Sequence, residues 1–229
     1  MVFSIEKWAE SNLSENGVAL LNESIKCYKV GAYRSSFIMS YLAFKVTIKD
    51  RIINASKPDN ITEICWNNEV ISKLKQDSQW EEKVNCLIDQ SVKNGSGLKG
   101  VFCFSNDETV KHRYAYWKSI RNSCAHARNE HITAATVEQF WNYMVDDSPE
   151  YYVLGGKAFL SKQITEIFKY FYSYTKEELY SLLNQVEQVF GSSTKDFFKG
   201  FFAENPSATV LNKKTETFGR LLSIIEMIS

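Results

Sequence analysis

The side chains best suited to chemistry lie in one stretch of this chain, where Arg121 and Asn122 are followed by His126. Arginine carries a permanent charge and can donate two parallel hydrogen bonds to a phosphate, whereas histidine moves protons near neutral pH. RNA brings its own nucleophile, the 2′-hydroxyl, so these two groups can cleave it without a metal. The imidazole would accept or deliver the proton, and the guanidinium would offset the charge on the phosphate. The residue types therefore predict Arg121 and His126 as catalytic residues, with Asn122 orienting the site.

The products of such a reaction follow from its nucleophile. Attack by the 2′-hydroxyl leaves a 2′,3′-cyclic phosphate and a 5′-hydroxyl end, and DNA, which lacks that hydroxyl, is not cut. Helix geometry adds a condition, because positions 121 and 126 lie about 140° apart on a regular α-helix. The two side chains converge if the helix unwinds near Ser123–Ala125, or if both face a groove shared with a second copy of the chain.

Each of these residues also has a purely structural interpretation. Arg121 could pair with an acidic neighbour, and His126 could satisfy the end of a helix, where a donor or a positive charge is favourable. Asn122 could be a cap residue in the last turn. The other two histidines, His112 and His131, are expected at the surface rather than in catalysis.

The overall charge restricts the kind of partner that the chain can bind. It has 27 basic and 27 acidic residues and a formal net charge of zero. Non-specific coating of nucleic acid would need an excess of Lys and Arg, so a restricted target is expected, such as a folded RNA of the tRNA kind. Positive groups do gather around the motif, at Lys111, His112, Arg113, Lys118, Arg121, His126 and Arg128. Lys118, three residues before Arg121, is expected to contact substrate phosphates.

Cysteine usage and the N-terminal sequence predict a cytoplasmic protein. The five cysteines are widely spaced and include no CxxC pair, which is typical of reduced thiols and argues against a zinc site. Cys124 falls on an apolar stripe, so it is expected in the core and not as a nucleophile. Residues Met1–Glu6 lack the features of a signal peptide, and no run is long enough to span a membrane. No metal and no other cofactor is expected.

The spacing of apolar residues predicts an all-α fold. Only 3 prolines and 10 glycines interrupt the chain, which favours long helices. Apolar positions at intervals of three and four predict helices over about 14–30, 32–54, 81–92, 107–127 and 133–146, with one or two short helices within 61–79. Residues 101–104 are too short to assign. The expected helix caps are Ser4 or Ser14, Ser105 or Asp107, and Thr133.

The last third of the chain forms a distinct layer in this prediction. Its spacing indicates helices over 160–174, 177–190, 194–202 and 215–228, separated by short runs of Gly, Ser, Asn and Pro. We therefore expect a helical domain over residues 1–148 and a helical extension of unknown role over residues 149–229.

The residues from Tyr114 to His131 read YAYWKSIRNSCAHARNEH and resemble the HEPN family. Its hallmark is an Arg, usually followed by a polar residue, and then a His after four to six positions. The segment Gly31–Phe37 resembles the start of the second helix in that family, and the helix expected after Thr133 falls where the last core helix should follow. The resemblance covers the organisation of residues 14–146 and is sharp over 117–127. It does not extend beyond residue 150.

The resemblance implies a bundle of HEPN type and a metal-independent endoribonuclease that acts as a toxin or an antiviral defence effector. It also implies a homodimer in which two motifs face each other across a two-fold axis, so that each chain supplies Arg121 and His126 to a composite site. Tyr33 and Arg34 would line the same groove, or they would simply begin a helix that is exposed to water.

Several partners and one rival function go with this expectation. RNA is the expected substrate, and an antitoxin or sensor is a candidate for restraining the activity, either as a partner or as another part of a longer protein. Many members of the family keep the fold and lose the activity. The alternative is therefore a non-catalytic HEPN-like domain that binds RNA, a nucleotide or a partner protein.

Overall fold

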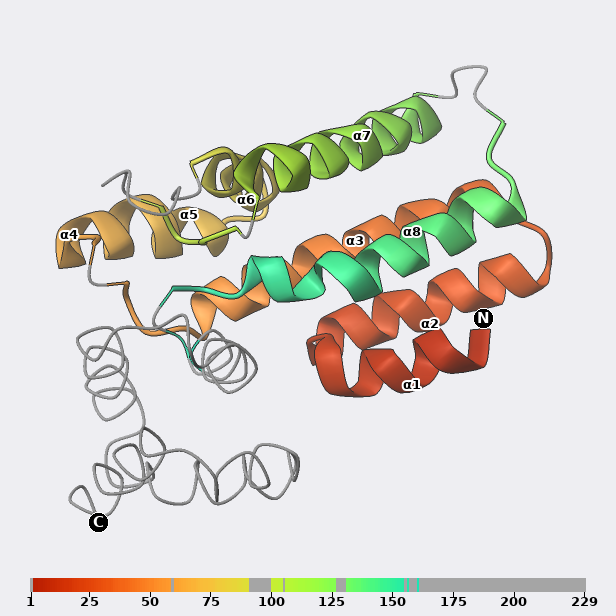
Figure 1. Ribbon diagram of the computed structural model, residues 1–229, viewed down its shortest axis with the longest axis horizontal. Coiled ribbons are helices and arrows are strands. Elements are labelled where there is room, and N and C mark those ends of the chain that lie inside the picture. Colours follow the sequence, from red (N-terminus) through yellow and green to blue (C-terminus); the bar gives the residue numbers. More distant parts are fainter. Residues whose placement is uncertain are drawn as a thin grey trace, which may run out of the picture. The chain divides into compact units, whose positions relative to one another are not determined.

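The structure is a computed structural model that describes residues 2–58, 60–90, 100–104, 106–126, 131–154, 156 and 160 (Figure 1). These residues form helices and one isolated antiparallel bridge, between Phe102 and Val153. The fold is all-α, as predicted. In chain order its α-helices are α1 (Val2–Asn12), α2 (Glu15–Lys29), α3 (Tyr33–Ile53), α4 (Glu63–Cys65), α5 (Ser72–Leu74), α6 (Trp80–Asp89), α7 (Asp107–Ala125) and α8 (Ala134–Asp147).

The chain divides into two compact units, Met1–Leu154 and Gly155–Ser229. Residues just beyond the predicted division after 148 belong to the first unit. Ser148–Tyr151 form a 3₁₀-helix, the Tyr151 side chain is fully buried, and Val153 pairs with Phe102. The helices predicted between 160 and 228 lie in the second unit, outside the described residues.

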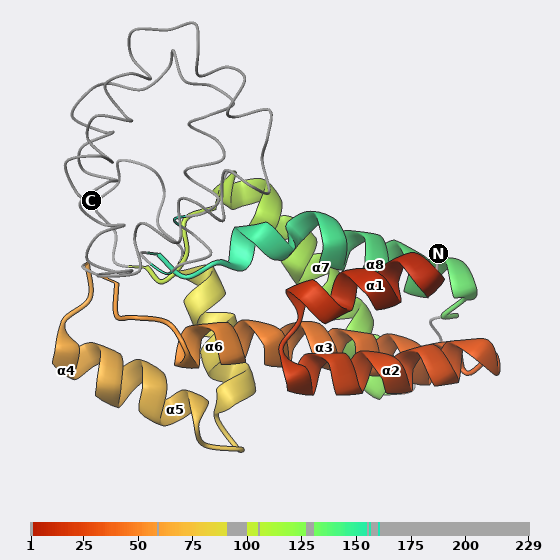
Figure 2. The same ribbon diagram turned by 90° about the horizontal axis from the view of Figure 1, so that it is seen from below.

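Helix α3 lies at the centre of the first unit, where it contacts α2, α6, α7 and α8. Figures 1 and 2 show α2, α3 and α8 side by side, and α1 contacts both α2 and α8. The predicted stripe of α3 is buried, with Phe37, Tyr41, Phe44, Ile48 and Ile52 each at most 1% exposed. A helix that meets four others must bury most of its circumference, which is why α3 also buries polar residues such as Ser36, Ser40 and Lys45.

The stripes predicted for α7 and α8 are confirmed as the faces that meet α3. Val110, Tyr114, Trp117, Ile120 and Cys124 of α7 are buried, as are Val137, Phe140, Trp141 and Met144 of α8. Aromatic rings join the three helices, because Phe140 lies 5.1 Å from Phe37 and 5.2 Å from Trp117 between ring centroids. Tilted and edge-on contacts of this kind add to the free energy gained by burial.

The helix caps correct some of the sequence predictions. Ser14 caps α2 and accepts a hydrogen bond from the Gly17 backbone, as predicted. Ser4, however, lies inside α1, which begins at Val2. The cap of α7 is Asn106, whose side chain accepts from the Thr109 backbone at 3.0 Å. Asn caps a helix as well as Asp does, and Asp107 then falls in the first turn, where a negative charge favours the helix dipole.

The weakly patterned region over 61–79 is one helical run from Glu63 to Leu74. A π-helical turn over Trp66–Ile71 joins α4 to α5. Trp66, Val70 and Leu74, four residues apart, are buried on one face of this run, whereas Ile64, which the sequence pattern grouped with the apolar positions, is 75% exposed.

A close approach between α2 and α3 makes Gly17 the first site to test. A Cβ atom at this position would lie 2.2 Å from Thr47 Oγ1 and 3.1 Å from the Ala43 carbonyl oxygen. The Thr47 hydroxyl cannot turn away without losing the hydrogen bond that it accepts from the Ser14 backbone. Gly17→Ala is expected to lower the free energy of unfolding by about 1–3 kcal/mol through overpacking.

Urea unfolding monitored by circular dichroism measures this loss. The neighbouring, exposed Asn16→Ala serves as the control, because it changes the same helical turn without meeting α3. Equal stability of Gly17→Ala and the wild type would contradict the close packing of α2 on α3.

Candidate functional site

Helix α7 positions the motif and remains regular to its end. It is α-helical through Ala125, and His126 is its C-cap, with a backbone N–H that donates to the carbonyls of Asn122 and Cys124. The option that the helix unwinds near Ser123–Ala125 is therefore wrong. Burial of Cys124 holds the last turn against the core, and Arg34 Nη1 donates to the Cys124 carbonyl at 3.5 Å. A cation at these carbonyls stabilises a helix C-terminus.

The Arg121 guanidinium is held by two hydrogen bonds and one ring. Nη1 donates to Asn122 Oδ1 at 3.3 Å, and Nη2 donates to Glu81 Oε2 of α6 at 2.9 Å. The guanidinium carbon lies 5.9 Å from the centre of the Tyr41 ring. Asn122 thus makes the contact through which it could orient the arginine, and it lies within α7 rather than at its end.

In the purely structural interpretation, Arg121 pairs with an acidic neighbour. Glu81 is such a neighbour. The Arg121 and Glu81 side chains remain 26% and 34% exposed, however. Ion pairs that water can reach contribute about 0–1 kcal/mol to stability. This small contribution does not by itself explain why an arginine occupies position 121. The contact orients the guanidinium more than it stabilises the fold.

A buried polar cluster lies behind Arg121, between α3, α6 and α7. Lys45 Nζ donates to the Glu81 carbonyl at 2.9 Å, to Asn85 Oδ1 at 2.6 Å and to the Tyr114 hydroxyl at 3.1 Å. Tyr114 in turn donates to Asn85 Oδ1. Burial lowers the pKa of Lys45 from 10.5 to about 7, and the charges of Lys118 and Arg121 act in the same direction. Lys118, three residues before Arg121 on the regular helix α7, lies on a neighbouring part of the same helix surface.

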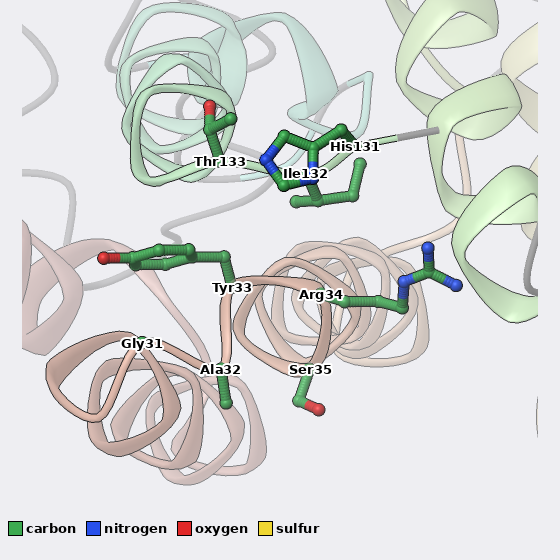
Figure 3. A pocket seen from close by; sticks show the side chains of 8 residues that line it. All are labelled: Gly31, Ala32, Tyr33, Arg34, Ser35, His131, Ile132 and Thr133. Carbon is green, nitrogen blue, oxygen red and sulfur yellow. The ribbon is translucent and has the colours of Figure 1, made fainter. Parts of the chain in front are cut away.

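Tyr33 and Arg34 lie in a second place, at the start of α3. Together with His131 and Thr133 they line a pocket of about 450 Å³. Figure 3 shows Tyr33 and Arg34 extending in opposite directions from the start of α3, with Thr133, Ile132 and His131 across from them. His131 is exposed, as expected, and it is also a wall of this pocket.

The structure thus divides the predicted site residues into two groups. Lys118, Arg121 and Asn122 are associated with the buried cluster, whereas Tyr33 and Arg34 line the pocket. His126 belongs to neither group. It is exposed at the C-terminal end of α7, and it does not line the pocket. The contact of Arg34 with the Cys124 carbonyl joins the pocket to the turn that carries His126.

Sequence reasoning missed Lys45 and its partners. A detectable signal existed, because Lys45 lies four residues after Tyr41 and three before Ile48, within the stripe that α3 buries. A lysine buried at such a position must find hydrogen-bond acceptors, because burying its charge without them costs free energy. The partners Glu81 and Asn85 carry no such signal, since they lie on a different helix.

Metal-binding groups and membrane-spanning helices are absent from the part of the chain that the structure describes. No group of three or more His, Cys, Asp or Glu side chains there could hold a metal ion. Cys124 is 4% exposed and lies in the core, as predicted. None of the helices in those residues combines the length and hydropathy needed to cross a bilayer.

In comparisons with known proteins, no family model, curated protein or solved structure matches this chain.

The contribution of the Arg121–Glu81 pair to stability is the next measurable quantity. A double-mutant cycle with Glu81→Gln, Arg121→Gln and the double variant isolates the coupling between the two side chains. Because both side chains are partly exposed, the coupling free energy is expected to stay below about 1 kcal/mol and to shrink at high salt.

Urea unfolding of the four proteins at low and high salt gives this coupling directly. A value of about 3 kcal/mol or more, insensitive to salt, would instead mark a buried structural pair. That outcome would favour the purely structural interpretation of Arg121.

Proposed function

We propose that this protein is a metal-independent endoribonuclease of HEPN type that acts as a toxin or an antiviral defence effector. One observation carries the proposal. The Arg121 guanidinium is fixed by Asn122 and Glu81 while its side chain stays partly open, on a helix that ends at the exposed His126. Phosphodiester cleavage needs an oriented but accessible cation and an imidazole that substrate can reach.

The chemistry follows from the hydrogen-bond capacity of these groups. A guanidinium has five N–H donors, and the described partners of Arg121 use two of them. The remaining donors can grip a phosphate and offset the charge that builds up in the transition state. His126 then accepts the proton of the 2′-hydroxyl or delivers one to the leaving 5′-oxygen. Lys118, on the same side of α7 as Arg121, attracts the neighbouring phosphates.

The regular end of α7 supports a composite site between two copies. On an unbroken helix Arg121 and His126 project about 140° apart, so they do not meet within one chain. A two-fold axis solves this problem, because the arginine of one protomer can face the histidine of its partner, and the same contact recurs on the other side. The proposal therefore includes a homodimer with two equivalent sites.

The expected biological setting follows from the charge and from the activity. A net charge of zero favours the recognition of a restricted RNA target, such as a tRNA, over indiscriminate binding of all RNA. An antitoxin or sensor partner would restrain the activity in the cytoplasm. Tyr33 and Arg34 would hold RNA beside the helix end that carries His126.

A non-catalytic HEPN-like domain is the second candidate, and the Glu81 contact favours it. A carboxylate already bound to Arg121 neutralises the group that should bind phosphate. In that case the pocket lined by Tyr33 and His131 would bind RNA, a nucleotide or a partner protein without cleaving anything.

Cleavage assays separate the two candidates. Purified wild-type protein with total RNA and EDTA should produce 2′,3′-cyclic phosphate and 5′-hydroxyl ends. Arg121→Ala and His126→Ala should each lower the rate by about 100-fold or more, because each removes a group that acts on the transition state. His112→Ala, a substitution of an exposed histidine two turns before the motif, should cleave like the wild type. Absence of cleavage by the wild type would refute the enzyme.

Mixing the two inactive variants tests the composite site. After subunit exchange, a heterodimer of Arg121→Ala and His126→Ala contains one site with both catalytic groups and one with neither. Random exchange should therefore restore about a quarter of the wild-type activity. Sedimentation measures the dimer, and a mixture that stays inactive despite exchange would show that each arginine works with the histidine of its own chain.

A further inference from the structure

Lys45 is a fully buried cation in the middle of α3. Its ammonium group has three N–H donors, and three acceptors meet them: the Glu81 carbonyl, Asn85 Oδ1 and the Tyr114 hydroxyl. All three are neutral. A buried ammonium without a bonded carboxylate costs several kcal/mol even when its hydrogen bonds are complete.

A hydrophobic side chain would fill this position with less cost in free energy. Lys45 is surrounded by the aromatic residues of α3 and α7, and its nitrogen lies 6.0 Å from the Tyr41 ring centre and 5.8 Å from that of Tyr114. Replacing buried charges by apolar groups of similar volume is often neutral or stabilising. Stability therefore does not explain why a lysine occupies position 45. The position of Lys45 relative to Arg121 does explain it.

Two contacts connect Lys45 to Arg121. Lys45 binds the main-chain carbonyl of Glu81, and the carboxylate of the same residue binds Arg121. The Tyr41 ring lies close to both cations, 6.0 Å from Lys45 Nζ and 5.9 Å from Arg121 Cζ. A change in the charge of Lys45 thus acts on the partner of the guanidinium and on its electrostatic surroundings.

We propose that Lys45 is a positioning residue that holds Glu81 in register with Arg121 and adds positive potential beneath the guanidinium, so that its protonation controls how tightly Arg121 binds a phosphate. The inference rests on the function proposed above and assigns a regulator to the same site. When Lys45 loses its proton, one of the three acceptors loses its donor and the positive potential disappears. Phosphate binding should therefore weaken as the pH rises through the pKa of Lys45, which is about 7.

The groups around Lys45 determine this response. Burial is the largest cause of the lowered pKa, Lys118 and Arg121 lower it further, and Glu81 and Glu82 oppose the shift. The charged, titratable or polar groups that face Lys45 are Tyr41 on α3, Glu81, Glu82 and Asn85 on α6, and Tyr114, Lys118 and Arg121 on α7. The pKa values of Tyr41 and Tyr114 are raised above 10 by burial, so neither hydroxyl titrates near neutral pH.

The direct test follows the Nε–H signal of Arg121 by NMR, identified as the arginine signal that Arg121→Lys removes. In the wild type this signal should move with a midpoint near pH 7. The movement should vanish in Lys45→Met and persist in Lys49→Met, a matched control one turn later on α3, where the lysine stays partly exposed. His126 is present in all three proteins, so it cannot produce this difference. A signal that behaves alike in the wild type and Lys45→Met would overturn the inference.

Asn85→Asp provides a second variant with opposite effect. It places a carboxylate 2.6 Å from the ammonium in almost the same volume, so the midpoint of the Arg121 signal should shift to higher pH. An unchanged midpoint would count against Lys45 even if Lys45→Met folds poorly. Both NMR readouts stand without any enzyme activity, so a wild type that cleaves no RNA would refute the proposed function and leave this test intact.

Activity and stability complete the experiment. In RNA cleavage, Lys45→Met should lose about ten-fold in rate at pH 6.5 and should lack the wild-type decline above pH 7, whereas Lys49→Met should match the wild type.

Stability gives a separate readout of Lys45. At this residue the unfolded chain binds more protons than the native one between about pH 7 and pH 10.5, so Lys45 makes the wild type more stable as the pH rises through that window. Lys45→Met should lack that rise. A structural role alone would leave the pH profile of cleavage unchanged.

Discussion

An unbroken helix cannot bring together side chains that are five residues apart, and α7 is unbroken to Ala125. This constraint decides how the motif can work. Two kinds of contact hold the end of α7: its apolar stripe is buried against α3 and α8, and Arg34 of α3 donates to the carbonyl of Cys124 in the last turn. Unwinding would expose Cys124 and break that contact. In the proposed enzyme, Arg121 of one chain would therefore have to act with His126 of a second chain.

The surroundings of Arg121 show how one helix can combine apolar packing with a buried cation. α3 presents aromatic and aliphatic residues to its four neighbouring helices, yet the same buried stripe contains Lys45, which donates to the main-chain carbonyl of Glu81. The polar cluster is completely hydrogen-bonded through Asn85 and Tyr114, which limits its cost. What remains is the desolvation of one positive charge. This desolvation lowers the stability of the fold. Residues that lower stability in this way are common at functional sites, and Lys45 lies next to the candidate site.

Features that depend on local sequence were predictable, and those that depend on pairing between distant segments were not. The stripes of α3, α7 and α8 follow from spacing alone, and Ser14 and Thr133 cap helices through contacts three residues away. The pair of Arg121 with Glu81 joins residues 40 positions apart, and no periodicity indicates it. The π-turn at Trp66–Ile71 was not predicted, because the buried residues Trp66, Val70 and Leu74 are four apart and fit an α-helix equally well. Lys45 was visible as a charge within an apolar stripe, but its partners were not.

Glu81 has opposite consequences in the two interpretations of Arg121. As a structural partner it satisfies the arginine, and nothing further is required. In the proposed enzyme it competes with the phosphate, so only a substrate that makes additional contacts can take the guanidinium from the carboxylate. A chain with zero net charge has no general attraction for RNA to help in that competition. The needed contacts must then be local, from Lys118 and the residues near the end of α7. In that enzyme the competition would lower the affinity of every RNA by the same factor, so only an RNA that makes further contacts would still bind well enough to be cut.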